Sequence, residues 1–200
     1  MSKVLVNPPK LLKKNPFHKK TAKYKQTGIC AIVPINSKKY KLQTFNSKKY
    51  LPKNAYITHY GKCGACSSLQ DLAVYKKNHN LTSPVKRCAL KGMVLKRWNN
   101  KCVKNLGFSD SCSQIWFYNS QNALKKCWKP CLRHYFSKNN ISKNKLNPCL
   151  KCDEDVNGMT FKKFAGRTRR NSGIKSAIQR THISKIRKSR RKRKSRRKRK

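Results

Sequence analysis

Nine of the ten cysteines lie between residues 63 and 152, and this clustering limits the possible folds more than any other feature of the 200-residue chain. The three tryptophans, Trp98, Trp116 and Trp128, fall in the same interval, so most of the large apolar side chains belong to residues 58–152. A core built from so few residues is small, and small domains usually need covalent cross-links or metals to be stable. The sequence therefore predicts one small cysteine-rich domain.

Disulfides and zinc are the two ways in which such cysteines can stabilise a small domain. The spacings Cys63-x2-Cys66 and Cys149-x2-Cys152 match the two halves of a four-thiolate zinc site. However, compact zinc modules place the second pair about 12–20 residues after the first, and these pairs lie over eighty residues apart. We therefore expect disulfides and no metal, with the connectivity open among Cys63, Cys66, Cys88, Cys102, Cys112, Cys127, Cys131, Cys149 and Cys152. Because nine cysteines cannot all pair, either Cys30 completes a fifth bridge or one thiol remains free.

Helix signals recur through this region. Ser67-Ser68 can cap a helix, and Ser83-Pro84 has the order of cap and proline that opens one. A third helix is expected from Asp110 towards Pro130, which should kink or end it because proline lacks a backbone N–H. The predicted fold class is therefore mainly α, with the small disulfide-linked domain at residues 56–180.

The residues before this domain, 1–55, are expected to form a Lys-rich extended arm, because prolines interrupt every helical pattern there. The pentapeptide Asn-Ser-Lys-Lys-Tyr occurs at 36–40 and again at 46–50. Each copy offers two cations and one aromatic ring, a combination that holds phosphates and stacks bases. Compositional drift in a chain rich in Lys and Asn is the alternative explanation of this repeat.

Positive charge greatly exceeds negative charge, with 52 Lys and Arg against five acidic residues and a formal net charge of +47. Residues 1–62 contain fifteen Lys and no acid. The tail, residues 181–200, has almost nothing apolar to bury, so we expect it to stay disordered until a polyanion neutralises it. Its last sixteen residues hold the predicted nucleic-acid-binding residues Lys185, Arg187, Lys188, Arg190, Arg191, Lys192, Arg193, Lys194, Arg196, Arg197, Lys198, Arg199 and Lys200.

Nucleic acid, DNA in preference to RNA, is the polyanion that best fits this tail, because phosphate contacts release condensed counterions and need no sequence information. A nuclear-localisation signal or an anchor to an anionic surface is the alternative. No apolar run approaches the ~18 residues of a spanning helix, and the N-terminus has no apolar stretch of signal-peptide length. We expect no transmembrane segment, no cofactor and no enzymatic activity.

A dithiol oxidoreductase is the rival function from another class. Cys63 and Cys66 have the spacing of a redox pair and precede a predicted helix N-terminus, which lowers the pKa of a thiol. Thioredoxin-like pairs follow a buried strand, however, and the residues before Cys63 do not resemble one.

Calcium binding is a weaker alternative. Asp153, Asp155 and Asn157 match the opening of an EF-hand loop, but the twelfth position is Phe164 instead of Glu. A simpler role for the acidic residues 153–155 is a cluster of ion pairs with Arg167, Arg169 and Arg170, which would close the domain.

Three motifs resemble an uncharacterised cysteine-rich family of algae, oomycetes and large DNA viruses. They are His-Tyr-Gly-Lys-Cys-Gly-Ala-Cys-Ser at 59–67, Asn-Pro-Cys-Leu-Lys-Cys-Asp-Glu-Asp at 147–155 and Ala-Gly-Arg-Thr-Arg-Arg-Asn-Ser-Gly-Ile at 165–174. The resemblance implies disulfides, because cellular members look secretory, and it implies no activity. The added basic arms resemble a giant-virus version of the domain, which implies a virion or genome-packaging protein located in the virion or the host cytoplasmic virus factory, with other virion proteins as partners and the nucleus as the alternative location.

Overall fold

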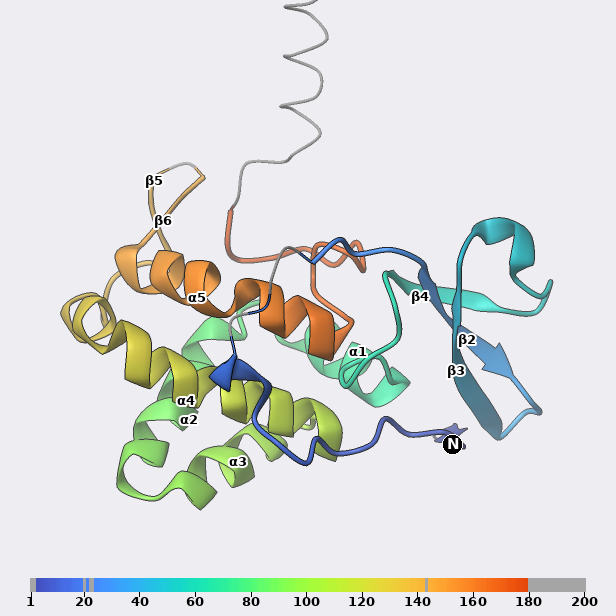
Figure 1. Ribbon diagram of the computed structural model, residues 1–200, viewed down its shortest axis with the longest axis horizontal. Helices are drawn as coiled ribbons and strands as arrows, with labels where there is room; N and C mark the ends of the chain where they lie inside the picture. The colour runs from blue at the N-terminus through green and yellow to red at the C-terminus, as the bar shows by residue number, and fades with distance from the viewer. Residues whose placement is uncertain (1–2, 20, 22–23, 143, 180–200) are drawn as a thin grey trace, which may run out of the picture.

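The computed structural model describes residues 3–19, 21, 24–142 and 144–179 (Figure 1). In this part of the chain, five α-helices gather on one side and a four-stranded sheet lies on the other. A short hairpin of β5 (Asn140–Ser142) and β6 (Lys145–Leu146) joins the last two helices. Helix predominates, so the prediction of a mainly α fold holds for one side of the molecule only.

The sheet has the strand order β1-β3-β2-β4. Its strands are β1 (Val4–Leu5), β2 (Ile29–Pro34), β3 (Lys39–Phe45) and β4 (Tyr56–Tyr60). The central strand β2 is antiparallel to β3 and β4, and β1 pairs in parallel with β3. Cys30 and Ile32 pack on one face, whereas Ala31, Val33 and Phe45 form a small cluster on the other. β2 is thus buried on both faces, as its continuous apolar sequence requires.

The prediction of an extended arm over residues 1–55 is wrong for residues 29–45, which form β2 and β3. Prolines interrupt helices but are tolerated at the ends of strands, and Pro34 is the last residue of β2. Between β1 and β2, the chain runs along the helices and forms the short 3-10 helix η1 (Pro16–His18). Phe17 of η1 is buried in the core between the helices.

Two of the predicted helix starts are close to those observed. α1 (Leu69–Lys77) begins after Ser68, whose Oγ accepts a hydrogen bond from the Asp71 backbone N–H at 3.0 Å. α2 (Thr82–Val94) begins one residue before Ser83, and the Asn80 side chain accepts from its first N–H at 3.1 Å. Short polar side chains at these positions satisfy N–H groups that have no partner within the helix.

The third predicted helix is α4 (Asp110–Arg133), which Ser109 caps. Its backbone leaves helical geometry at Cys127, where φ is −120° and ψ is 15°. Pro130 explains this kink, because it supplies no N–H and its ring would collide with the carbonyl of residue 126 in a regular helix. The expectation of a kink at Pro130 is confirmed.

Two helices, α3 (Lys96–Lys104) and α5 (Pro148–Ala165), were not predicted from the sequence. α5 begins with an Asn147 cap, whose Oδ1 accepts from the Leu150 N–H at 2.9 Å, followed by Pro148 in the first turn. This is the same order of cap and proline that predicts α2. The same rule therefore applies to α5, although it was not used to predict a helix there.

All ten cysteines are described, and all form disulfides. The bridges are Cys30–Cys63, Cys66–Cys112, Cys88–Cys102, Cys127–Cys152 and Cys131–Cys149. The prediction of disulfides is confirmed and the alternative four-thiolate zinc site is excluded, since its four sulfurs are used in four different bridges. Cys30 completes the fifth bridge, which fixes the central strand of the sheet to the loop after β4.

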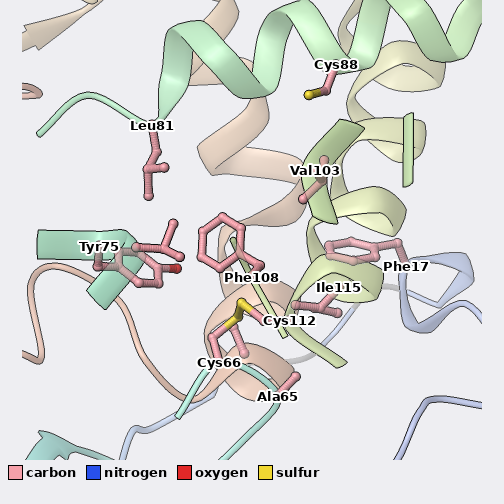
Figure 2. Packing of buried hydrophobic residues seen from close by; sticks show 12 residues of the cluster. Phe17, Ala65, Cys66, Tyr75, Leu81, Cys88, Val103, Phe108, Cys112 and Ile115 are labelled. Atoms are coloured by element: carbon pink, nitrogen blue, oxygen red, sulfur yellow. A yellow bond between two sulfur atoms is a disulfide. The ribbon is translucent and has the colours of Figure 1, made fainter. Parts of the chain in front are cut away.

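The main core lies among the helices (Figure 2). The Cys66–Cys112 disulfide sits within it beside Phe108 and Ile115, and Phe17 reaches it from the N-terminal segment. Tyr75 packs edge-on against Phe108, with ring centroids 5.7 Å apart. A covalent bond therefore joins the loop before α1 to α4 at the centre of the packed side chains. Among the described helices, none is both long enough and apolar enough to cross a bilayer.

Candidate nucleic-acid interface and the network that supports it

The predicted nucleic-acid-binding residues of the tail, from Lys185 to Lys200, lie outside the residues that the structure describes. The described residues show how the remaining positive charge is distributed and how the few carboxylates are used. These two points determine which surfaces attract a polyanion.

Each of the five carboxylates has a partner within the helical side. Asp71 is buried and accepts hydrogen bonds from Ser68 Oγ at 2.6 Å and from the Ser109 backbone N–H at 2.9 Å. The other four are held as Asp110–Lys104, Asp155–Lys151 and Glu154–Arg170 ion pairs and as the Asn157–Asp153 hydrogen bond. The carboxylates therefore neutralise little of the charge elsewhere on the molecule.

The predicted ion-pair cluster between residues 153–155 and three arginines forms only in part among the described residues. Arg170 pairs with Glu154. Arg169 instead donates to the backbone carbonyls of Asn78 and Lys175 and lies 5.6 Å from the ring centroid of Tyr75. Arg167 is buried in a different place, against the loop before α1.

The sheet and the turns between its strands contain lysines, and residues 1–62 include no acidic residue. These lysines are all exposed, and they are Lys38, Lys39, Lys41, Lys48, Lys49 and Lys53. Residues that lie opposite each other on neighbouring strands point to the same face of the sheet. Val33 of β2 lies opposite Lys41, and Ala31, two positions earlier on β2, lies opposite Ile57. Lys39 and Lys41 therefore share a face with Ile57. This face presents two cations beside one exposed apolar side chain, a surface that suits contact with phosphates. Sequence reasoning had placed these lysines on an arm, although the alternating burial of β3 follows the period of a strand.

The two Asn-Ser-Lys-Lys-Tyr copies have different environments. Tyr40, from the first copy, is 2% exposed, and its hydroxyl accepts a hydrogen bond from the Leu69 N–H at 3.0 Å. It supports the start of α1 and cannot stack a base. Tyr50, from the second copy, is 65% exposed and ends a 3-10 turn, η2 (Lys48–Tyr50). The stacking hypothesis is therefore limited to the second copy.

The geometry does not assemble the predicted redox pair. Cys63 bonds to Cys30 and Cys66 bonds to Cys112, so the two sulfurs belong to separate bridges. Cys66 and Cys112 are both fully buried. A dithiol site needs its two cysteines to bond reversibly to each other, and this arrangement holds them apart.

The predicted calcium ligands lie in the middle of α5 instead of in a loop. Asp153 and Asn157 are one turn apart and hydrogen-bonded to each other at 2.7 Å, whereas Asp155 pairs with Lys151 on the exposed surface. An EF-hand needs a loop that turns all its oxygens inward. A helix directs side chains two positions apart to different sides, so these three do not converge.

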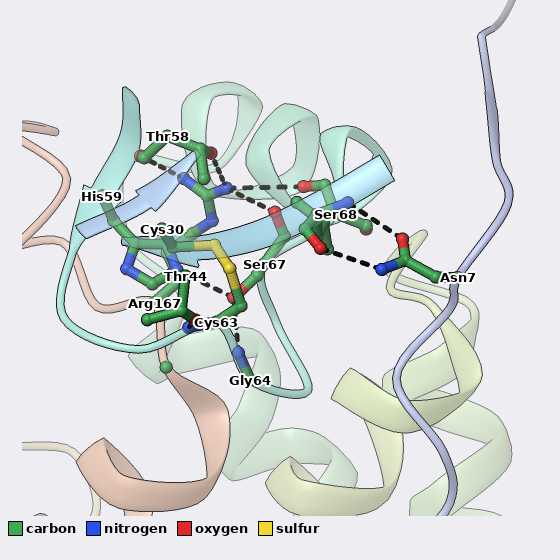
Figure 3. Close-up of a disulfide and its surroundings, with 12 residues drawn as sticks. Asn7, Cys30, Thr44, Thr58, His59, Cys63, Gly64, Ser67, Ser68 and Arg167 are labelled. Atoms are coloured by element: carbon green, nitrogen blue, oxygen red, sulfur yellow. Dashed lines mark hydrogen bonds between the residues drawn. A yellow bond between two sulfur atoms is a disulfide. The ribbon is translucent and has the colours of Figure 1, made fainter. Parts of the chain in front are cut away.

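Arg167 is the largest fully buried side chain (Figure 3). Its Nε donates to the Cys66 carbonyl at 2.9 Å, and its Nη1 donates to the Thr58 carbonyl at 3.0 Å. Its Nη2 donates to the Ser67 carbonyl at 2.9 Å and to Thr58 Oγ1. We call these four residues, Thr58, Cys66, Ser67 and Arg167, the Arg167 network. It joins β4, the loop before α1 and the chain that follows α5.

The carbonyls of the Arg167 network are neutral, so they satisfy hydrogen bonds without balancing the charge. Burial lowers the pKa of Arg167 to about 10, and the nearby charges of Tyr75 and Asp71 act in the opposite direction. Asp71, the buried carboxylate of α1, forms no direct ion pair with Arg167 in the described structure. The Arg167 network therefore holds β4, the loop before α1 and the chain after α5 in position. Its disruption should strongly reduce stability, because buried donors without acceptors are unfavourable.

Two glycines allow the chain to cross itself beside Arg167. A Cβ on Gly64 would lie 2.6 Å from the Phe164 carbonyl oxygen, and one on Gly166 would lie 2.6 Å from the Gly64 nitrogen. Gly166 also has a φ of 72°, which residues with a side chain rarely adopt. Backbone hydrogen bonds from Ala65 to Phe164 and from Cys66 to Ala165 complete the crossing. Two of the sequence motifs, 59–67 and 165–174, thus form one structural unit.

His59 lies in the same unit and is 1% exposed. Its Nδ1 is 3.1 Å from the Tyr60 carbonyl, which can only accept, so Nδ1 carries the proton. Its Nε2 then accepts from Ser67 Oγ at 2.8 Å. A serine beside a histidine is the arrangement of a nucleophile and its base, but Ser67 is fully buried and out of reach of a substrate. The pair is structural and holds the histidine neutral.

Acid should destabilise the fold through His59. Burial is the main cause that lowers its pKa from 6.5 to about 4. Between these values the unfolded chain binds a proton that the folded protein rejects, so the free energy of unfolding should fall by about 3 kcal/mol as the pH decreases through this window. Urea unfolding at several pH values measures this loss.

The matched control is His59→Gln, whose amide oxygen can accept the same Ser67 hydrogen bond but does not titrate. Asp71, whose pKa burial raises, and Arg167 face the same unit and are common to both proteins. The control should lose much less stability over the same window. Equal slopes for the two proteins would show that His59 is not the responsible group.

Residues 96–187, less than half of the chain, match the model of a family of unknown function (DUF8771). The matched span contains α3, α4, α5 and Arg167, but not the sheet. No curated protein and no solved structure matches this chain. The similarity brings no assigned activity, so a function has to be inferred from the chemistry of the residues themselves.

Proposed function

We propose that this protein is a non-enzymatic nucleic-acid-binding protein that condenses or anchors DNA without reading its sequence. The observation that carries this proposal is the net charge of +47 together with the use of all five carboxylates inside the helical side. Ammonium and guanidinium groups without carboxylate partners gain free energy when they contact phosphates and release the condensed counterions. Phosphate contacts position a protein on a duplex but carry no sequence information.

Two basic elements support this function. The tail from Lys185 to Lys200 supplies thirteen cations, and the sheet presents Lys39 and Lys41 from a single strand. Self-repulsion of so many cations opposes a compact state. Five disulfides counteract it, because each cross-link restricts the unfolded chain. A covalently fastened domain can therefore hold a dense positive charge in place before its partner binds.

We further infer that the protein packages or anchors a viral genome inside a particle. The resemblance of the three motifs to a family with viral members supports this inference, and so does the addition of basic arms to the domain. A packaged genome supplies the anionic partner, and other virion proteins are further candidate partners. The virion or the host cytoplasmic virus factory is the corresponding location, and the nucleus is the alternative.

Salt dependence tests the proposal directly. If all thirteen tail cations contact duplex phosphates, the slope of log affinity against log salt is about −12, and incomplete contact gives about −6 to −10. Fluorescence anisotropy with two duplexes of unrelated sequence measures the slope. Deletion of residues 183–200 should remove most of it, and the two duplexes should bind equally.

Two variants locate the remaining contacts. Changing Lys39 and Lys41 together to Gln should reduce the slope by about 1.8 if the sheet contacts phosphates. The matched control, Lys151→Gln, removes a lysine that already pairs with Asp155 and should leave the slope unchanged. A truncated protein that keeps the full slope would move the main interface from the tail to the sheet. Salt-insensitive or strongly sequence-selective binding would contradict the proposed function.

A further inference from the structure

A cavity of about 1310 Å³ lies between α2, the second half of α4 and α5, and residues 168–179 contribute to its wall. The wall is mainly apolar, and it includes Val85 and Ala89 of α2, Leu124 and Trp128 of α4, and Leu150 and Phe161 of α5. Small-molecule sites usually measure about 300–1,000 Å³ and combine apolar walls with a few polar groups. This cavity has room for a larger ligand with a long hydrocarbon part.

Several large apolar side chains of this wall are exposed to water. Met93 is 67% exposed, Trp128 is 54% exposed, Leu132 is 69% exposed and Phe136 is 97% exposed. A single exposed apolar side chain is ordinary, but a group of them around one hollow indicates a binding site. Their removal from water on binding would favour an apolar ligand.

The described residues of the wall include five Lys and Arg side chains, which are Lys86, Lys162, Arg169, Arg170 and Lys175. Among them, Lys86 is the one on α2. It lines the wall, is partly buried, and forms no hydrogen bond or ion pair among the residues that the structure describes. Burial lowers the pKa of Lys86, since its ammonium is partly removed from water without a compensating partner. The two acidic residues of the wall are already engaged, Asp153 with Asn157 and Glu154 with Arg170. An anionic group of a ligand would therefore supply the partner that the Lys86 ammonium does not have among the described residues.

Three other occupants fit these features less well. A second copy of this chain would bring another +47 charge to the same face. The tail, residues 181–200, has only two large apolar residues, Ile183 and Ile186, and would place more cations beside Lys86. Nucleic acid is anionic, but its charged backbone has no long apolar part to fill the cavity.

We propose that the cavity binds a long-chain anionic amphiphile, with its hydrocarbon chain between α2 and α4 and its carboxylate or phosphate head beside Lys86. The ligand is held by apolar burial along the chain and by one charge-assisted contact at the head. Among the described residues, none from the four-stranded sheet lines this cavity, so binding of the amphiphile can be tested without nucleic acid.

Three probes with the same sixteen-carbon chain separate the contributions of chain and head: palmitate, hexadecanol and hexadecyltrimethylammonium. Titration of the full-length oxidised protein, below the solubility limit or micelle concentration of each probe, should show one-to-one binding of palmitate. Hexadecanol should bind about 10- to 100-fold more weakly, which is the usual value of a hydrogen bond to a charged group. Lys86→Gln should weaken palmitate binding to the level of hexadecanol, and the cationic probe should bind most weakly of the three.

A filled cavity provides the second arm of the test. Ala123→Trp adds a large side chain inside the cavity and should weaken palmitate binding by at least about tenfold. Ala73→Trp adds the same side chain on the exposed face of α1, outside this cavity, and should leave binding unchanged. Brominated palmitate offers a readout that needs no filled cavity, because it should quench the fluorescence of Trp116 and Trp128, which both line the wall, and Trp128→Phe should remove the contribution of Trp128.

Non-specific attraction of anions to a basic protein would give a different pattern. Several palmitates would bind, high salt would remove them, and Ala123→Trp would have no effect. That result, or equal affinity for palmitate and the cationic probe, would overturn the proposal. Persistent one-to-one binding in high salt, lost in Ala123→Trp and retained after deletion of residues 183–200, would support it.

Discussion

Replacing Arg167 with methionine is expected to reduce the free energy of unfolding by about 3–5 kcal/mol, because three buried carbonyls lose their donor. Methionine resembles the aliphatic part of the arginine side chain but donates no hydrogen bond. The carbonyls of Thr58, Cys66 and Ser67 would then be buried without their donors, and each such group costs about 1–3 kcal/mol. Two of these carbonyls belong to the loop that joins the sheet to α1, so the damage should extend to both sides of the molecule.

Urea unfolding of the oxidised protein, followed by circular dichroism, measures this effect. Arg170→Met is the matched control, because it makes the same chemical change three residues later at an exposed ion pair with Glu154. Exposed pairs contribute about 0–1 kcal/mol, so the control should unfold almost as the natural protein does. Arg167→Lys keeps the charge but not the forked donor geometry and should lie between them. Equal losses for Arg167→Met and Arg170→Met would contradict the importance of the network.

Removal of the Cys66–Cys112 bridge should produce the second large loss of stability. The two cysteines are 46 residues apart, and the chain-entropy relation gives about 4 kcal/mol for a loop of that length. Both residues are fully buried beside Phe108 and Ile115, so changing them to Ala also leaves unfilled space in the core. Thermal and urea unfolding of the double variant, with the other bridges intact, measure the loss.

The Cys88–Cys102 bridge is the comparison for this prediction. It closes a loop of only 14 residues, for which the same relation gives about 3 kcal/mol. Its removal should therefore cost less than removal of Cys66–Cys112. The reverse order would show that loop length and core burial do not control the stability that these disulfides provide.

Local signals in the sequence predicted local structure well. Ser68 and Ser109 cap helices near the expected positions, and Pro130 kinks α4. These features depend on side chains within a few residues of the helix end, so a short sequence window contains the physical cause. The Asn147-Pro148 start of α5 belongs to the same class and could have been recognised by the same rule.

Long-range structure could not be predicted in this way. Arg167 lies 109 residues from Thr58 and 101 residues from Cys66 in sequence. Within its own segment it is one of several arginines, and the nearest acidic residues suggested ion pairs as its role. Only the folded chain distinguishes it from Arg170, because burial and not residue type separates the two. The pairing of β2 with β4 has the same cause, since the contacts of a strand are made with distant segments.

The cysteine connectivity is a further case. Spacing alone allowed a zinc site, a redox pair or several disulfide maps. The observed partners are separated by 14 to 46 residues, and neither Cys-x2-Cys motif pairs within itself. The candidate nucleic-acid interface was predicted as the tail and as the two Asn-Ser-Lys-Lys-Tyr copies, because Lys39 and Lys41 could not be assigned to one surface until the sheet was known.

The two Cys-x2-Cys motifs also affect the order in which the disulfides can form. Cys63 and Cys66 go to different bridges, and so do Cys149 and Cys152. In a newly made chain, cysteines three residues apart meet far more often than distant ones, since short loops close at a smaller entropic cost. Early oxidation therefore favours pairs that are absent from the final map. Such early pairs give way to the observed bridges only through thiol–disulfide exchange, so we expect the reduced chain to refold better with a reshuffling thiol and an oxidant together than with an oxidant alone.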